Sequence, residues 1–332
     1  MSCAYLAFTD RGLALAHRLS QAQPGSVERC GKDGVRLADW TSRNFALCEA
    51  LVFVGAVGIA VRAIAPHCRS KATDPAVVVV DEAGQFAIPV LSGHLGGANA
   101  LARALATACG AVPVITTATD VRGVFAVDEW AKQAGCTVLE PERIKKVSGR
   151  LLAGEPVGFW SEFPVNGTPP AGVSPAPSQQ QADFALTLFP QGEGLHLVPV
   201  IGVLGVGCRR GTTAQQLEAA FAAFCARCAL SPRCICAAAS IDLKQNEAGL
   251  LEFCAAHRWA VSFYSAGQLK AVPGSFTPSA FVCSVTGVDN VCERAAALAA
   301  RGTIRIPKQA ADGVTFALAL RPYAPDWRNQ NG

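Results

Sequence analysis

One histidine among glycines and one aspartate after a threonine cluster are the residues of this chain best suited to acid–base chemistry. His94 lies in Ser92-Gly93-His94-Leu95-Gly96-Gly97, directly after the apolar stretch 88–91. Asp120 ends the segment Thr116-Thr117-Ala118-Thr119-Asp120. An imidazole exchanges protons near neutral pH, so we predict that His94 and Asp120 activate water or shuttle a proton. The competing structural roles are a loop-ordering hydrogen bond for His94 and a helix N-cap for Asp120.

Two further glycine-rich segments follow apolar stretches. They are Gly55-Ala56-Val57-Gly58, after 51–54, and Gly205-Val206-Gly207-Cys208-Arg209-Arg210-Gly211, after 200–204. Backbone N–H groups in such turns can bind carboxylates, although a tight turn without a ligand has the same composition. Neither segment has the Gly-Lys-Ser/Thr of a phosphate loop or the third glycine of the dinucleotide fingerprint, so a nucleotide cofactor is not supported.

Strand and helix patterns alternate along the chain and predict an α/β fold with largely parallel sheets. The apolar stretches 77–80 and 88–91 are joined by Asp81-Glu82-Ala83-Gly84, which indicates a hairpin. We expect an N-terminal α/β domain at 1–136 and a C-terminal α/β domain at 199–332. A small middle domain at 137–198 joins them and contains a proline- and glutamine-rich loop at 166–182.

The expected fold also places the unusual loops. Ligands of open α/β sheets bind beyond the carboxyl ends of the strands. We therefore expect the loops at Gly55, Ser92 and Thr116 to face a ligand together. The loops at Gly205 and Ser240 should face it from the C-terminal domain.

Composition excludes several classes of protein. The 332 residues are 51% apolar and 16% charged, and the net charge of +4 comes without a basic run, which argues against nucleic-acid binding. No apolar run approaches the ~18 residues of a membrane helix, and the N-terminus does not resemble an export signal, so we expect a cytoplasmic protein without a membrane partner.

The chain has 14 cysteines, which we expect to be reduced thiols. The spacing of Cys225, Cys228, Cys234 and Cys236 is compatible with zinc, but their apolar helix and strand settings favour core packing. We predict no metal site in the protein.

Taken together, these motifs resemble the cobalt-precorrin-5A hydrolase family of anaerobic vitamin B12 synthesis. The resemblance covers 52–131 and 205–315 and adds little over 137–198. It includes the stretches around Arg62, Lys71, His94, Asp120 and Gly205, then Ser240-Ile241-Asp242-Leu243-Lys244, Thr286-Gly287-Val288-Asp289-Asn290 and Lys308. It implies three domains and a hydrolase that opens the δ-lactone of cobalt-precorrin-5A and releases acetaldehyde, which gives cobalt-precorrin-5B.

The resemblance implies a cobalt macrocycle with many acetate and propionate arms as the substrate. Cobalt belongs to this substrate, so no resident cofactor is expected. The candidates for substrate binding are Arg62, Lys71, Ser92, Gly96, Gly97, Asn99, Thr116, Thr117, Gly205, Gly207, Arg209, Asp242, Lys244 and Lys308. Arginine and lysine would pair with carboxylates, and the glycine turns would offer N–H groups to an oxyanion.

The expected partners are this small-molecule cobalt corrinoid and, in transient contact, the precorrin methyltransferases. The alternative function is that of a non-catalytic tetrapyrrole-binding or handover protein of the same pathway. It would bind the intermediate without releasing acetaldehyde.

Overall fold

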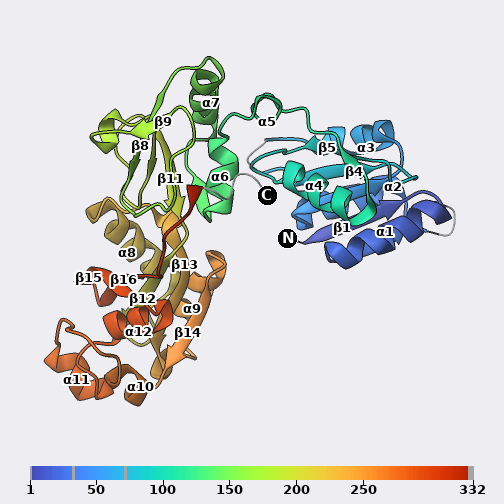
Figure 1. Ribbon diagram of the computed structural model, residues 1–332. Helices are drawn as coiled ribbons and strands as arrows, with labels where there is room; N and C mark the ends of the chain where they lie inside the picture. Colours follow the sequence, from blue (N-terminus) through green and yellow to red (C-terminus); the bar gives the residue numbers. More distant parts are fainter. Residues whose placement is uncertain (1, 32–33, 71–72, 328–332) are drawn as a thin grey trace. The chain divides into compact units, whose positions relative to one another are not determined.

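A computed structural model describes residues 2–31, 34–70 and 73–327. The chain divides into two compact units, which are treated separately below (Figure 1). The first unit comprises Met1–Lys132 and Ile144–Glu155, and the second comprises Gln133–Arg143 and Pro156–Gly332. Three sheets form the framework, which confirms the predicted α/β class. Among the described residues, no helix is long and apolar enough to span a bilayer.

The first unit is built on a six-stranded sheet. Its strands, in spatial order, are β2 (Gly25–Arg29), β1 (Cys3–Ala7), β3 (Ala50–Val54), β4 (Ala76–Val80), β5 (Phe86–Leu91) and β6 (Val112–Pro113). The strands β1, β3 and β4 are parallel and fully buried, which explains their unbroken apolar sequences. Helices α1 (Asp10–Ala22) and α4 (Ala98–Cys109) pack on one face, and α2 (Leu37–Leu47) and α3 (Val57–Ile64) pack on the other (Figure 1).

The hairpin of β4 and β5 decides where the loops of this sheet lie. Asp81 forms the turn, since its carboxylate accepts hydrogen bonds from the backbone N–H groups of Ala83, Gln85 and Phe86. β5 is therefore antiparallel to β4, as predicted, and β6 runs parallel to β5. The loops that follow β5 and β6 consequently lie at the edge where β3 and β4 begin. The prediction that the Gly55 loop faces a ligand together with the Ser92 and Thr116 loops is wrong, because Gly55 lies at the opposite edge.

Shorter helices complete the first unit. They are η1 (Ala65–His67), α5 (Ala118–Arg122), α6 (Val127–Gln133, whose last residue belongs to the second unit) and α7 (Ile144–Leu152).

The middle sheet belongs to the second unit. Its strands, in spatial order, are β7 (Cys136–Val138), β11 (Leu195–Pro199), β10 (Phe184–Leu186), β8 (Val157–Ser161) and β9 (Val173–Pro175), with 3-10 turns at η2 (Pro141–Arg143) and η3 (Gln179–Gln181). The segment 166–182, expected to be an irregular loop, contributes β9 and η3. β9 is an edge strand and therefore tolerates Pro175, and the buried Gln179 donates a hydrogen bond to the carbonyl of Phe189.

The second unit also contains the C-terminal sheet. Its strands, in spatial order, are β14 (Ala260–Tyr264), β13 (Ile235–Ile241), β12 (Gly202–Cys208), β16 (Val314–Leu320) and β15 (Thr303–Ala311). Its helices are α8 (Ala214–Arg227), η4 (Pro232–Cys234), η5 (Asp242–Lys244), α9 (Ala248–Ala256), α10 (Ala266–Lys270), α11 (Ala280–Thr286) and α12 (Val291–Ala300). β15 and β16 form a hairpin that the sequence analysis missed, although Asp312 and Gly313 at its turn are typical hairpin residues with positive φ.

Gly205 has a packing role in this sheet. It lies inside β12, and a Cβ atom at this position would lie 1.9 Å from the carbonyl oxygen of Cys292 in α12. The expectation that Gly205 lies in a turn after a strand is wrong, because it lies inside β12 and lets α12 cross the strand at close range.

We expect Gly205→Ala to lower the free energy of unfolding by roughly 1–3 kcal/mol, because α12 must move away from β12. Thermal and urea unfolding of the full chain would measure the change. Gly267→Ala is the matched control, since a Cβ atom there meets only Ser265 Oγ at 3.9 Å. Equal stability of the two variants would show that the close approach is unimportant.

Candidate functional site

The loop between β5 and α4 presents His94. Its backbone is tightly specified, because Ser92 has a φ of 56° and Gly97, the N-cap of α4, has a φ of 88°. A Cβ atom on Gly96 would lie 2.3 Å from the Cβ of Ser92. The Ser92 carbonyl accepts a hydrogen bond from Ala98 N at 3.1 Å. Ser92, Gly96 and Gly97, predicted to bind substrate, thus have a clear role in folding this loop.

Both ring nitrogens of His94 contact carboxylates. Nε2 lies 2.8 Å from Oδ2 of Asp120 in α5, and Nδ1 lies 3.2 Å from Oδ1 of Asp128 in α6. Thr119 Oγ1 is a further 3.4 Å neighbour of Nε2. The structure therefore brings the two predicted catalytic residues into direct contact. The imidazole connects three separate segments of the first unit.

Side chains of α4 also donate hydrogen bonds to Asp120. Its carboxylate accepts hydrogen bonds from Arg103, from the Thr117 hydroxyl and from the Asn99 amide, the last at 3.1 Å. Asn99 and Arg103 are one helical turn apart and therefore share a face of α4. Asn99 is only 2% exposed, so it supports the cluster from inside.

These contacts set the charges of the pair. Burial alone would lower the pKa of His94, but hydrogen bonds and charges from Asp128 and Asp120 outweigh it and raise the pKa to about 9. Burial would raise the pKa of Asp120, but hydrogen bonds from Thr117, His94 and Arg103 lower it to about 2. At neutral pH the pair is an imidazolium and a carboxylate, so His94 is not available as a base.

Three members of this cluster were not among the predicted site residues: Arg103, Asp128 and Glu129. Arg103 NH1 lies 3.9 Å from Oε1 of Glu129. Burial, followed by the negative charge of Asp120, raises the pKa of the Glu129 carboxyl. Arg103 could have been predicted from the sequence, because it follows Asn99 by four residues and therefore shares its helix face. The positions of Asp128 and Glu129 depend on tertiary packing.

The cluster has some features of a metal site. Ligand atoms of His94, Asp120 and Glu129 lie within 4.8 Å of one another, and no other such group occurs among the described residues. However, the guanidinium of Arg103 already lies against Asp120 and near Glu129. We therefore interpret the group as a cluster of ion pairs in which the imidazole of His94 is protonated.

The cysteines considered for zinc have a different role. Cys225 and Cys234 belong to a hydrophobic core cluster, and burial raises the pKa of each thiol. Cys228 packs against the same cluster and Cys236 against a second one, so all four cysteines occupy core positions.

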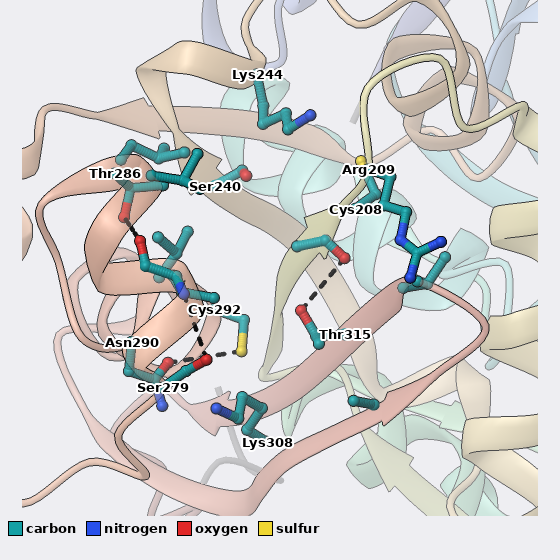
Figure 2. A pocket seen from close by; sticks show the side chains of 18 of the residues that line it. Cys208, Arg209, Ser240, Lys244, Ser279, Thr286, Asn290, Cys292, Lys308 and Thr315 are labelled. Carbon is teal, nitrogen blue, oxygen red and sulfur yellow. Dashed lines mark hydrogen bonds between the residues drawn. The ribbon is translucent and has the colours of Figure 1, made fainter.

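The second unit contains a pocket of about 510 Å3. It lies at the carboxyl ends of β12 and β13 and is also lined by α11, the start of α12 and the β15–β16 hairpin (Figure 2). Its cationic lining residues are Arg209, Arg210, Lys244 and Lys308, and none of the described residues that line it has a carboxylate side chain. Apolar side chains such as Ile241, Val282 and Val291 complete it. Such a lining suits an anion that also has an apolar body.

The cations surround the pocket from different elements. Figure 2 places Lys244, Arg209 and Lys308 on three sides of it. Lys244 Nζ lies 3.0 Å from Oε1 of Glu247, and Lys308 Nζ donates to the Thr277 carbonyl at 3.3 Å. Arg209 is exposed, and its guanidinium passes beside Gly313 at the hairpin turn. Arg209, Lys244 and Lys308, predicted separately, are thus gathered around one pocket.

Cys208 and Gly207 also line this pocket. Burial raises the pKa of the Cys208 thiol, which opposes a role as a nucleophile.

Four other predicted residues belong neither to the His94 cluster nor to the pocket of the second unit. Arg62 is exposed in the last turn of α3, and Thr116 is exposed after β6. Asp242 lies in η5 but is not a lining residue of the pocket. Lys71 lies outside the described residues.

Family comparisons cover almost the whole chain. The model for the cobalamin synthesis G N-terminal region matches 39–120, and the model for the C-terminus matches 202–319. The cobalamin biosynthesis central region matches 125–190. The expectation that the middle of the chain adds little to the resemblance is therefore wrong.

Curated relatives give the same result. The cobalt-precorrin-5A hydrolase of Salmonella typhimurium is 34% identical over 342 residues, which covers 96% of this chain and 97% of the relative. The enzyme of the same name from Priestia megaterium is also 34% identical, over 83% of this chain and 79% of the relative. A solved structure from Sulfolobus solfataricus, of a homologue assigned to cobalamin biosynthesis protein G, covers 97% of each chain at 20% identity with a TM-score of 0.43. From the family models and the curated relatives, we conclude that the chain belongs to the cobalt-precorrin-5A hydrolase family.

Proposed function

We propose that this protein is a cobalt-precorrin-5A hydrolase, which opens the δ-lactone of cobalt-precorrin-5A and releases acetaldehyde to give cobalt-precorrin-5B. The observation that carries the proposal is the cluster of His94, Asp120 and Asp128. A binding protein needs a pocket, but it has no need for a buried ion cluster, which costs desolvation energy. Buried groups with shifted pKa values, here His94 and Asp120, are typical of sites that handle protons.

The proposed reaction consumes one water. The water oxygen bonds to the lactone carbonyl carbon and the ester bond to the ring oxygen breaks, which leaves a carboxylate arm and an alkoxide. The alkoxide oxygen then becomes the carbonyl oxygen of acetaldehyde as the bond between its carbon and the macrocycle breaks. The electron pair of that bond and one proton stay with the macrocycle. No electron acceptor takes part, so the reaction as written requires no resident cofactor, and cobalt arrives with the substrate.

The pocket of the second unit is the proposed binding site for substrate carboxylates. Its arginine and lysine side chains would pair with acetate and propionate arms, while its valines and Ile241 would contact the apolar ring edge. The lining favours a polyanion, because it has four cationic side chains, of which Lys244 is already paired with Glu247.

The cluster of the first unit would serve the proton transfers. His94 is protonated at neutral pH and has both nitrogens engaged, so its proposed role is to hold Asp120 and Asp128 and to contribute a fixed positive charge. This revises the predicted role of His94 from a base to a positioning residue. We also propose that the protein is cytoplasmic and that it contacts precorrin methyltransferases transiently.

Incubation with cobalt-precorrin-5A tests the function directly. We expect one acetaldehyde per substrate consumed, measured with a coupled aldehyde assay and by mass spectrometry of the macrocycle. Tight binding without acetaldehyde would support the alternative, a tetrapyrrole-binding or handover protein.

The pocket is tested by removing charge. We expect Arg209→Gln and Lys308→Gln each to raise the Kd for a stable cobalt corrinoid polycarboxylate by about tenfold, the cost of a charge-assisted hydrogen bond. Titration calorimetry of the full chain would measure this. Arg233→Gln is the matched control, because Arg233 is exposed in the same unit and does not line the pocket. Equal Kd values for all three variants would refute the assigned binding site.

The charge on His94 predicts a pH dependence of stability. Its pKa rises from 6.5 to about 9 on folding, so its stabilising contribution is complete below pH 6.5 and disappears as pH rises through 9. We expect the stability difference between the natural protein and His94→Gln to shrink by roughly 2–3 kcal/mol between pH 6 and about pH 10. Urea unfolding at several pH values would measure it. A constant difference would mean that His94 is neutral in the folded protein.

A further inference from the structure

The described contacts leave one carboxylate of the His94 cluster without a hydrogen bond. Asp120 accepts from Arg103, Thr117 and Asn99 and contacts His94, and Asp128 contacts His94. Glu129 differs, because within the described part of the chain its carboxylate forms a 3.9 Å ion pair with Arg103 and no hydrogen bond. A carboxylate with free lone pairs can accept a proton from water, whereas one saturated by neighbours cannot do so without breaking contacts.

The exposed fractions of the side chains also favour Glu129. The side chains of His94, Asp120 and Asp128 are 13%, 9% and 9% exposed. Those of Glu129 and Arg103 are 22% and 37% exposed. A molecule that approaches from solvent would therefore meet Glu129 and Arg103 first.

We propose that Glu129 is the catalytic base of the hydrolase and that Arg103 stabilises the oxyanion beside it. This inference rests on the proposed function. Glu129 takes one proton from the attacking water as the water oxygen bonds to the lactone carbonyl carbon. The guanidinium of Arg103 pairs with the negative charge that develops on the carbonyl oxygen. When the ester bond breaks, Glu129 returns the proton to the departing ring oxygen. It removes this proton again as acetaldehyde leaves and passes it to the macrocycle carbon, so the carboxylate is regenerated.

The surroundings of Glu129 suit this role. The charged groups facing it are Asp120 from α5, Arg103 from α4, His94 from the β5–α4 loop and its neighbour Asp128. Burial and the nearby charge of Asp120 raise the pKa of Glu129, which makes its carboxylate a stronger base than an exposed one. The positive charges of His94 and Arg103 limit this rise.

The test compares pH profiles of acetaldehyde release in the full chain. We expect Glu129→Gln to lower kcat by about 100-fold or more and to abolish the acidic limb of the profile. Asp128→Asn should lower kcat while it keeps that limb, because Asp128 acts through His94. Glu82→Gln, in the β4–β5 turn, is the matched control and should behave like the natural protein.

Chemical rescue provides a second readout. Added formate should restore part of the activity of Glu129→Ala and should leave Glu82→Gln unchanged. An unaltered acidic limb in Glu129→Gln, in a variant whose melting temperature is unchanged, would overturn the assignment. If the natural protein itself releases no acetaldehyde, the proposed function fails, and that result is distinct from a failure of the Glu129 assignment alone.

Discussion

The reversal of β5 against β4 is the constraint on which the first unit depends. The carboxylate of Asp81 accepts three backbone hydrogen bonds and thereby fixes the turn between the strands. Because β6 then pairs in parallel with β5, the segments after both strands emerge at the same edge. His94 and Asp120, 26 positions apart, meet there at hydrogen-bonding distance. In a sheet with β5 parallel to β4, the two loops would emerge at the edge of Gly55.

The cluster around His94 also illustrates how charge organises a loop region. The segments that carry His94, Asp120 and Asp128 are short and lie outside the main strands of the sheet. A buried imidazolium between two carboxylates offsets the desolvation of each partner only if all three are present. The cluster therefore joins α5 and α6 to the β5–α4 loop as one unit. Arg103 on α4 adds a second positive charge, which pairs with Asp120 and lies 3.9 Å from Glu129.

Sequence patterns could predict the strands, the β4–β5 hairpin and the loops that carry His94 and Asp120, because these depend on local periodicity and on which segments follow strands. They could not place Glu129 beside Arg103, since that contact depends on the tertiary packing of α6. Gly205 was misinterpreted because a glycine under a crossing helix and a glycine in a turn have the same sequence signature. The order in 166–182 was missed because edge strands accept proline and need no alternation. Arg209, Lys244 and Lys308 were chosen for charge alone, and only the fold shows that they surround one pocket.

The wall of the pocket that carries α11 is attached at its two ends. The N–H of Ser279 donates to the Asp289 carbonyl at 2.8 Å, and Asn290 donates its amide to the Thr277 carbonyl. Glu293, 2% exposed in α12, accepts hydrogen bonds from the Thr277 backbone and hydroxyl. A closed segment of this kind tolerates changes in length and sequence between its ends at a small cost in loop-closure entropy. Ligand preference could thus be redesigned at exposed lining positions of α11 such as Val285, whereas Val288 must stay because it belongs to the core that packs on the sheet.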